Sequence, residues 1–316
     1  MNTDLPQMRR LAAKVLAEIR STHPLVLSMT NSVAQGITAN MLLAVGAAPV
    51  MLKDRDEAEN LMDAGCGGVL LNVGTLSAAQ ATHMLDVAAA AQLRGIPWVL
   101  DPVAVGILNF RTAICRDLLK RCPAIIRGNA SEIMALAGYS ATSRGTDSTA
   151  SSADAVQAAQ ELADSTQAVV LVTGEVDYVT DGGSLYAIRS GHPLMTRVAG
   201  VGCAMGALCA ACLACSTNAM DAAVATSCIL GDAGLRAARR ASTVGSFATA
   251  LLDELDRPAP GTPSASPAGA GHETTADLFS QTTIRKHGNK IELRLKKPQP
   301  PRIRKRGGEI LPRESK

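Results

Sequence analysis

A short glycine turn at residues 200–203 is the part of this sequence best suited to chemistry. It reads Gly200-Val201-Gly202-Cys203, and an alanine-rich segment follows it. A glycine turn that leads into a helix presents free N–H groups to an anion, and the helix dipole adds positive potential there. Phosphoryl transfer needs such donors, because charge develops on the transferred group. Close packing of a helix explains the same glycines, and the turn alone does not decide between the two interpretations.

Cys203 stands at the expected start of the helix that follows this turn. The pKa of a cysteine thiol tends to be lowered at a helix N-terminus. We therefore expect Cys203 to have thiolate character and to lie near the reacting group of a bound molecule. Since a thiolate is a modest base, positioning and charge stabilisation should contribute more to the reaction than proton removal does.

A second motif places a basic and an acidic side chain around a predicted helix start. It reads Arg127-Gly128-Asn129-Ala130-Ser131-Glu132. Arg127 stands between an apolar strand and the helix, where a basic residue has little structural purpose, and its guanidinium suits nucleotide phosphates. Glu132 could hold Mg²⁺ through water. Asn129 and Glu132 also have the spacing of a helix capping box, which is the structural alternative.

Polar residues close several of the apolar runs, at the points where the predicted strands end. Asp101 precedes Pro102 and could serve as a second metal ligand or as an acid near phosphates, although a plain turn explains it equally well. Asn31, Asn72 and Thr173 close three other runs. In a parallel sheet, ligands bind beyond the carboxyl ends of the strands. Because several polar residues are expected at one edge of the sheet, a binding site is favoured over isolated helix caps.

Other catalytic and metal-binding signatures are absent from the sequence. It has no Gly-x-x-x-x-Gly-Lys-Ser/Thr phosphate loop, no protein-kinase glycine loop with a strand lysine, and no Gly-x-Ser-x-Gly elbow. The five histidines show no zinc-like spacing. Cys209, Cys212 and Cys215 recur every three residues, but on an apolar helix this spacing indicates small core residues rather than a metal site.

Short apolar runs alternate with helical patterns along most of the chain. Strands are expected at residues 25–29, 49–51, 68–72, 98–101, 124–127, 168–172, 178–181 and 185–188, the last two as a hairpin. Helices are expected at residues 1–20, 34–45, 56–64, 77–94, 113–122, 131–137, 153–164, 203–215, 219–238 and 247–255. This alternation predicts an α/β fold with a mostly parallel sheet and helices on both faces.

The overall composition agrees with such a fold and bears on the cellular environment. Hydrophobic residues make up 47 % of the 316 residues and aromatic residues only 2 %. This favours closely packed helices on a sheet over an aromatic-rich β-sandwich. No uncharged apolar run reaches the length of a membrane span, and the N-terminus lacks a signal-peptide pattern. With cysteines that look unpaired, these features predict a reducing, cytoplasmic location and no membrane association.

The composition changes at residue 258. Residues 1–257 hold 19 Lys/Arg and 23 Asp/Glu, a net charge of −4, whereas residues 258–316 hold 12 and 5, a net charge of +7. We expect one domain over 1–257, then a Pro/Gly/Ser-rich linker and a disordered basic tail. Residues 290–296 could form one strand, which is unstable without partners. The tail lacks interleaved aromatic residues, so we expect no specific nucleic-acid binding.

Five segments together resemble the hydroxyethylthiazole kinase family of the ribokinase-like superfamily. They are Met29-Thr30-Asn31, Asn72-Val73-Gly74-Thr75 and residues 100–106, 127–133 and 172–182. The segments stand in the order and spacing of that family, and the resemblance covers about residues 10–257. Members phosphorylate the hydroxyethyl arm of 4-methyl-5-(2-hydroxyethyl)thiazole in thiamine salvage. The resemblance implies a ribokinase-like α/β fold, Mg²⁺ and ATP, and a homotrimer with sites at subunit interfaces.

The resemblance also implies roles for individual residues. Met51 and Gly200 are at positions of thiazole-binding residues, and Arg127 and Thr173 are at positions of ATP-binding residues. Cys203 is at the catalytic position, which is cysteine in this family and aspartate in most other ribokinase-like enzymes.

For the metal, the resemblance implies an acid linked to Mg²⁺. Glu132 is at that position, and Asp101 is its expected companion. The same comparison shows a departure at Val201, where the family usually has threonine. If the missing hydroxyl bonded phosphate only in the transition state, its loss would cost about 1–3 kcal/mol, or roughly ten- to a hundred-fold in rate.

Two other functions fit parts of this pattern. A ribokinase-like nicotinamide-nucleotide-hydrate dehydratase shares the glycine turn, but it would carry aspartate at the position of Cys203. A non-catalytic binding protein would explain Val201 as decay and would use the basic tail to recruit partners. The intact set of Arg127, Asn129 and Glu132 argues against decay.

Overall fold

The computed structural model describes residues 1–139, 151–257, 282–287 and 290–295. The chain divides into two compact units, Met1–Pro260 and Gly261–Lys316. The division lies close to the expected domain end at residue 257. In the part of the chain that the structure describes, no helix has both the length and the apolar character needed to cross a membrane.

The first unit alternates strands and helices. Its strands are β1 (Leu25–Met29), β2 (Ala48–Met51), β3 (Gly68–Asn72), β4 (Trp98–Asp101), β5 (Ile125–Asn129), β6 (Val169–Thr173), β7 (Asp177–Thr180) and β8 (Leu185–Ile188). Its helices are α1 (Leu5–Thr22), α2 (Gln35–Val45), α3 (Arg55–Asp63), α4 (Ala78–Arg94), α5 (Asn109–Leu119), α6 (Ala130–Leu136), α7 (Val156–Thr166), the 3₁₀ helix η1 (Pro193–Arg197), α8 (Val201–Ala214), α9 (Ala219–Ala238) and α10 (Val244–Asp256).

The strands of this unit form one sheet in the order β2-β1-β3-β4-β5-β6-β7-β8. Strands β1 to β6 run parallel, and β7 and β8 form an antiparallel hairpin at one side. The register places Asn72 beside Asp101 and Asn129 beside Thr173. The predicted α/β fold, its mostly parallel sheet and the hairpin are therefore confirmed, and polar strand ends meet at one edge.

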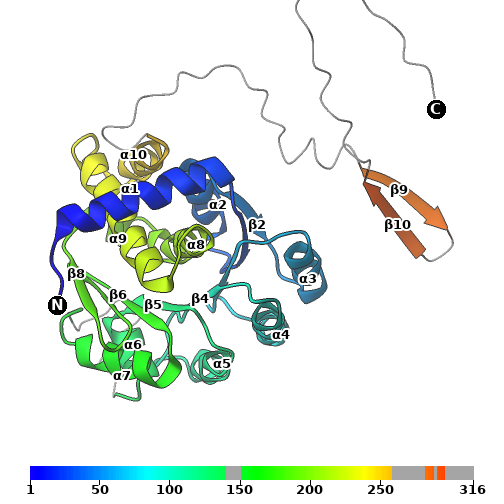
Figure 1. Cartoon of the computed structure of the whole chain (residues 1–316), viewed down its shortest axis with the longest axis horizontal. Helices are drawn as coiled ribbons and strands as arrows, with labels where there is room; N and C mark the ends of the chain where they lie inside the picture. The colour runs from blue at the N-terminus through cyan, green and yellow to red at the C-terminus, as the bar shows by residue number, and fades with distance from the viewer. Residues whose placement is uncertain (140–150, 258–281, 288–289, 296–316) are drawn as a thin grey trace, which may run out of the picture. The chain divides into compact units, whose positions relative to one another are not determined.

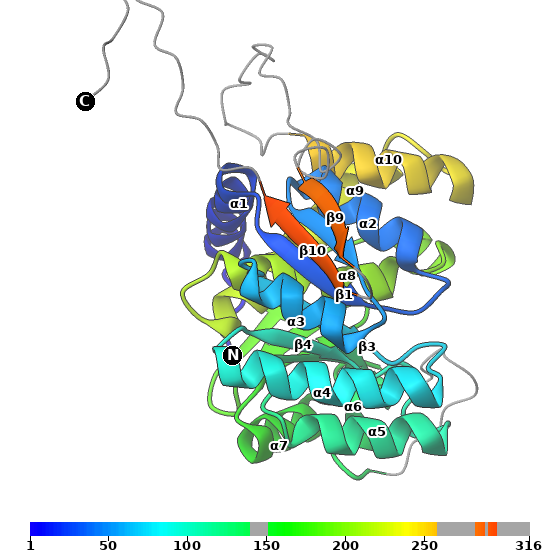
Figure 2. The ribbon, with the colours of Figure 1, turned by 90° about the vertical axis from the view of Figure 1, so that its right-hand side faces the viewer.

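Helices cover both faces of the sheet (Figure 1). Helices α1, α2, α8, α9 and α10 share an apolar core with one face, and α3 to α7 share a second core with the other. Figure 2 shows α3, α4 and α5 side by side over the second face. Leu70 and Ile125 belong to the first core, and their neighbours Leu71 and Ile126 to the second. Because both faces are buried, a one-residue slip would exchange every side chain between the cores.

Helix α8 lies very close to the sheet, over β3 and β4. A Cβ atom at Gly206 would lie 2.9 Å from Leu70 Cδ1, and one at Gly68 would meet the carbonyl oxygen of Ala210. Glycine on both elements therefore permits the approach. The start of α8 is brought to the polar strand ends in this way.

Five helices begin two or more residues from the start that the sequence pattern predicts. Helix α1 begins at Leu5 instead of 1, and α10 begins at Val244 instead of 247. Helix α5 begins at Asn109 instead of 113, and α8 begins at Val201 instead of 203. Helix α7 begins at Val156 instead of 153. Just before α7, the Ser151 N–H and Oγ donate to Asp154 Oδ2 at 3.0 and 2.7 Å. These local bonds stabilise a turn that competes with helix.

The second unit contains an antiparallel pair, β9 (Thr282–His287) and β10 (Lys290–Leu295). The sequence pattern predicts only the second strand, and it predicts that strand to lack a partner. The expectation of disorder is thus wrong for these two segments. The rest of the predicted disordered tail lies outside the described residues, and its disorder stays a prediction.

Candidate active site

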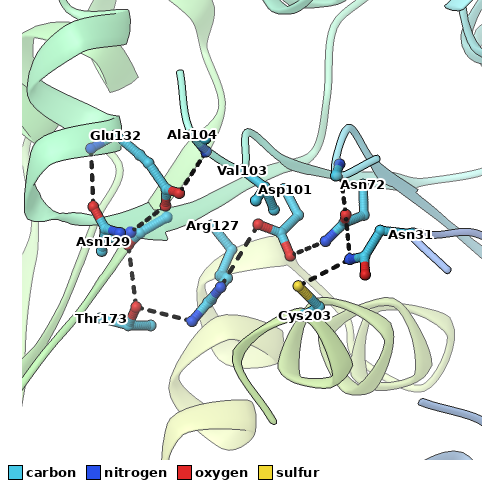
Figure 3. A network of polar contacts seen from close by, with 12 residues as sticks. Asn31, Asn72, Asp101, Val103, Ala104, Arg127, Asn129, Glu132, Thr173 and Cys203 are labelled. Carbon is cyan, nitrogen blue, oxygen red and sulfur yellow. Dashed lines mark hydrogen bonds and ion pairs between the residues drawn. The ribbon is translucent and has the colours of Figure 1, made fainter. Parts of the chain in front are cut away.

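Polar residues from the ends of neighbouring strands form a continuous chain of contacts (Figure 3). They come from β3, β4, β5 and β6, from the residues after β1, and from the first turn of α8. In order of contact they are Cys203, Asn31, Asn72, Asp101, Arg127 and Thr173. The structure thus brings together four of the predicted site residues and two asparagines that the pattern placed at the same edge.

Two asparagine amides connect Cys203 to Asp101. Asn31 Nδ2 donates to Cys203 Sγ at 3.1 Å and to Asn72 Oδ1 at 3.0 Å. Asn72 Nδ2 donates to Asp101 Oδ2 at 2.6 Å. Asn72 and Asp101 are both 0 % exposed. A broken bond at either residue would leave a buried polar group unpaired, so this arrangement is held firmly.

One of the two carboxylate oxygens of Asp101 accepts no hydrogen bond from the described residues. Its Oδ1 lies 3.6 Å from Arg127 Nη1 and has no hydrogen-bond partner among the residues that the structure describes. Burial raises the pKa of Asp101 to about 7, Arg127 and Asn72 oppose the rise, and the charge of Glu132 adds to it. Because a nearby cation favours the ionised form, cation binding would convert Asp101 fully to carboxylate.

Arg127 lies with its guanidinium against the start of α8. Its Nη2 donates to Thr173 Oγ1 at 3.0 Å. A Cβ atom at Gly202 would lie only 3.2 Å from the same Nη2. Burial alone would lower the pKa of Arg127, but the charges of Asp101 and Glu132 raise it above its ordinary value. A permanent cation therefore lies beside the positive end of a helix, which makes this a place of strong attraction for anions.

Gly200 forms the N-cap of α8 and requires glycine on two grounds. Its φ is +85°, in the left-handed region that favours glycine. A Cβ atom there would lie 2.8 Å from Ile37 Cγ2 and 3.1 Å from Ala34 Cα. Packing of α8 against α2 and presentation of helix amides therefore depend on the same residue, and the two interpretations of the turn are compatible.

The first turn of α8 offers backbone donors to an anion. The Val201 N–H donates to Val198 O at 3.4 Å. The next two N–H groups, of Gly202 and Cys203, are at first-turn positions that have no partner within an α-helix. The Val201 side chain is 3 % exposed and belongs to the first core. The position at which this chain departs from the threonine pattern therefore packs with apolar groups.

The predicted thiolate character of Cys203 is wrong. Burial raises the pKa of the Cys203 thiol, the charge of Asp101 adds to the rise, and the neighbouring asparagine amides and the charge of Arg127 only partly oppose it. Desolvation thus outweighs the effect of the helix end. The surroundings therefore favour the thiol form, which accepts a hydrogen bond from Asn31 and has an S–H of its own to donate.

Glu132 forms the capping box that was the structural alternative for its motif. Its Oε2 accepts the Asn129 N–H at 2.9 Å, while Asn129 Oδ1 accepts the Glu132 N–H at 3.0 Å. Its Oε1 accepts the N–H of Ala104 at 2.9 Å, and Ala104 has a φ of +63°. Burial raises the pKa of Glu132 in spite of these bonds. Glu132 therefore holds two loops in place, and its metal role stays a prediction.

Met51 lies outside this chain of contacts. It ends the edge strand β2, where it is half-buried and pairs with Ser28 of β1. Ser28 is 1 % exposed, and its Oγ has no hydrogen-bond partner among the described residues. The structure thus separates the predicted thiazole-binding position from the Arg127 end of the site by several strands.

The donor atoms give a limited test of a metal site. Among the described residues, no three His, Cys, Asp or Glu side chains are grouped to hold a metal ion. Cys209 and Cys212 are 0 % exposed in the first core, as the core interpretation of their spacing predicts. Asp101 Oδ1 is the donor that fits a cation, because it is a buried carboxylate oxygen without a hydrogen-bond partner within that part of the chain.

One residue of the site was not recognised from the sequence. A Cβ atom at Gly206 would lie 3.4 Å from Asp101 Oδ2, so glycine lets α8 cover that carboxylate. The signal was present, because Gly206 follows Gly202 by four residues and both therefore lie on one face of the helix.

Comparisons with known proteins match this chain to one family. A family model described as the hydroxyethylthiazole kinase family matches residues 16–258. A hydroxyethylthiazole kinase of Akkermansia muciniphila is 54 % identical over 240 residues, which cover 76 % of this chain and 89 % of that protein. A hydroxyethylthiazole kinase of Tolumonas auensis is 50 % identical over 248 residues, covering 78 % and 92 %.

Solved structures also resemble this chain. The hydroxyethylthiazole kinase protein of Pyrococcus horikoshii matches with a TM-score of 0.72 and 34 % identity, covering 78 % of this chain and 93 % of that chain. A ribokinase-like superfamily protein of Enterococcus faecalis, 11 % identical with a TM-score of 0.56, shares the fold over 78 % of this chain and 93 % of its own. The chain therefore belongs to the hydroxyethylthiazole kinase family.

Proposed function

We propose that this protein transfers the γ-phosphoryl group of ATP to the hydroxyl of 4-methyl-5-(2-hydroxyethyl)thiazole. The observation that carries the proposal is the position of the Arg127 guanidinium beside the start of α8, in a chain that belongs to this family. Two positive groups, one a side chain and one a helix end, converge beside Cys203. Transferred phosphoryl groups need such fixed positive charge more than they need covalent assistance.

Each residue of the site has a distinct task in this proposal. Arg127 and Thr173 bind the phosphates of ATP, and the N–H groups of Gly202 and Cys203 receive the γ-phosphoryl group. The Cys203 thiol contacts the acceptor hydroxyl and fixes its direction. Because the pKa of this thiol is raised, we assign it to orientation and hydrogen bonding rather than to proton removal. The new bond joins the acceptor oxygen to the γ-phosphorus, and ADP leaves.

A divalent cation is part of the proposal. Asp101 would hold Mg²⁺ through Oδ1, and Glu132 would contact it through water, since both Glu132 oxygens already accept backbone hydrogen bonds. When bound, the metal would offset negative charge on the phosphates. Met51 and Gly200 are proposed to contact the thiazole.

The remaining proposals concern the whole protein. We propose that it is a homotrimer of a kinase domain over residues 1–257, that it acts in the cytoplasm, and that it binds no specific nucleic acid. The dehydratase alternative loses support, because the relatives are named kinases and position 203 holds cysteine.

The test is a direct assay with a matched pair of arginine variants. The protein is incubated with MgATP and the thiazole alcohol, and ADP and phosphorylated thiazole are measured. Arg127→Met should lower kcat/KM at least a hundred-fold, whereas Arg9→Met, on the surface of α1, should leave it unchanged. Absence of phosphorylated thiazole at high enzyme concentration would overturn the proposed function, and equal activity of the two variants would remove the role given to Arg127.

A further inference from the structure

The direction of the Asn72 amide is fixed from both ends. At one end Asn72 Nδ2 donates to Asp101 Oδ2 at 2.6 Å, and a carboxylate oxygen accepts such a bond. At the other end Asn72 Oδ1 accepts the backbone N–H of Gly74 at 3.0 Å. A backbone N–H can only donate. The reversed amide would therefore face a donor with a donor, and the two contacts select the same orientation independently.

The orientation of Asn72 sets that of Asn31. Since Asn72 presents its oxygen, Asn31 must present its Nδ2, which donates to that oxygen at 3.0 Å. Asn31 Oδ1 is held by the N–H groups of Val33 and Ala34 at 3.1 and 3.0 Å. One N–H of the Asn31 amide therefore remains, and Nδ2 donates it to Cys203 Sγ at 3.1 Å.

The Cys203 sulfur consequently receives a hydrogen bond of fixed direction. A sulfur that accepts from Asn31 must direct its own S–H elsewhere, which leaves that hydrogen for another acceptor. The supporting elements are closely packed: a Cβ atom at Gly74 would lie 2.7 Å from Asn31 Cβ, so the turn after β3 packs directly on Asn31. Figure 3 shows the hydrogen bonds that link the carboxylate to the thiol through both amides.

We propose that Asn72 is a positioning residue for phosphoryl transfer: it is buried between Asp101 and Asn31, and through Asn31 it fixes the Cys203 thiol beside the start of α8. Asn72 touches neither substrate nor phosphate in this proposal. Its effect should therefore appear in turnover and depend on the presence of the thiol. The inference rests on the proposed kinase reaction, and it assigns a task to a residue that the strand-end pattern left without one.

A double-mutant cycle tests this coupling. The unaltered protein, Asn72→Ala, Cys203→Ala and the double variant are assayed with saturating MgATP and thiazole alcohol. Asn72→Ala should lower kcat about ten- to a hundred-fold with both KM values within about three-fold, since positioning errors act on the chemical step. In the Cys203→Ala background the same change should lower kcat less than about three-fold, because coupled residues are not additive.

Two controls separate positioning from folding. Asn218→Ala removes the N-cap of α9, which follows the end of α8 opposite to Cys203, and should lower the melting temperature without changing kcat. Asn72→Ser keeps a small polar group that cannot reach both Asp101 and Asn31. It replaces Asn72→Ala if that variant folds poorly, and it should show the same fall in kcat. Melting curves establish which variants are folded.

The results that would overturn the proposal are kinetic. The proposal is overturned if the two kcat effects multiply or if Cys203→Ala leaves kcat unchanged. An inactive unaltered protein would instead overturn the proposed function.

Discussion

At the scale of single residues, Cys203 shows how two known effects compete. A charge at a helix N-terminus is favoured by about 0.3–1 kcal/mol, and by up to about 2 kcal/mol in partly buried positions. Burial can shift a pKa by as much as about 3–5 units, which is worth several kcal/mol. The pKa of Cys203 is raised, and burial is the largest cause. A sequence pattern reveals the helix end, but it does not reveal how much solvent the thiol loses.

The departure at Val201 leads to a prediction. Its side chain is 3 % exposed in the first core, so a threonine hydroxyl placed there would be surrounded largely by apolar groups. Val201→Thr should change kcat less than about three-fold and lower the free energy of unfolding by about 1–3 kcal/mol, measured by urea titration. Val224→Thr, at a buried position of α9, should lower stability by a similar amount. A ten-fold or larger gain in kcat for Val201→Thr would restore the hypothesis of a missing phosphate contact.

The pKa of Asp101 predicts a pH dependence of stability. Its value is raised from 3.8 to about 7, chiefly by burial. Between these values the folded protein keeps a proton that the unfolded chain releases, so the stability that this group contributes falls as pH rises from about 4 to about 7. One pKa unit corresponds to about 1.4 kcal/mol.

The variant Asp101→Asn has no carboxyl group at this position and therefore no proton to release there. The free energy of unfolding of the unaltered protein, minus that of the variant, should therefore fall by roughly 2–3 kcal/mol between pH 5 and pH 8. Urea unfolding at several pH values, followed by circular dichroism without ATP or metal, measures this difference. Parallel curves for the two proteins, or a difference that grows with pH, would contradict the assignment.

At the scale of elements, Arg20 joins the two ends of the first unit. From the end of α1, its Nη2 donates to the carbonyl oxygens of Leu255, Asp256 and Arg257 at 2.7, 3.1 and 2.8 Å. The last carbonyl groups of a helix have no partner within the helix, and a cation there also opposes the negative end of the dipole. Arg20 is therefore the cap of α10.

Arg20→Met keeps most of the side-chain stem and removes these donors. The free energy of unfolding should fall by about 1–3 kcal/mol, because several carbonyl groups lose a charged partner. Arg9→Met, on the same helix, removes a pair with Asp232 in which the Arg9 side chain is 45 % exposed, and it should cost less than about 1 kcal/mol. Urea titration of both variants measures the contrast, and equal losses would show that α10 does not depend on Arg20.

The elements also show what a sequence pattern can and cannot predict. Buried parallel strands were predicted closely, because their apolar runs end at polar residues such as Asn72 and Asp101. Helix starts were predicted less well: the Ser151–Asp154 turn before α7 depends on side-chain bonds that hydrophobic periodicity does not contain. For the site, residue types and their common edge were predictable. The orientation of the Asn72 amide was not predictable, since it depends on three-dimensional contacts with a carboxylate and a backbone N–H.

At the scale of the whole molecule, the proposed catalytic machinery and the basic charge belong to different parts of the chain. The family match ends at residue 258, and the unit that contains the site ends at Pro260. Residues 1–257 carry 19 Lys/Arg and 23 Asp/Glu, whereas residues 258–316 carry 12 and 5. The excess positive charge is therefore a property of the tail, and a change in the tail should alter charge-dependent behaviour before it alters catalysis.

Truncation after residue 260 tests that separation. The last helix of the first unit ends at Asp256, and its Arg20 cap is complete at Arg257, so the shortened chain keeps every contact described for the site and for α10. We expect kcat and both KM values to stay within about two-fold and the melting temperature to change little, because stability resides in the two cores of the first unit. Retention on a cation exchanger at pH 7 should fall sharply, since most of the excess positive charge is removed. A loss of turnover on truncation after residue 260, with the melting temperature unchanged, would show that the basic segment takes part in the reaction and would move the domain boundary beyond residue 260.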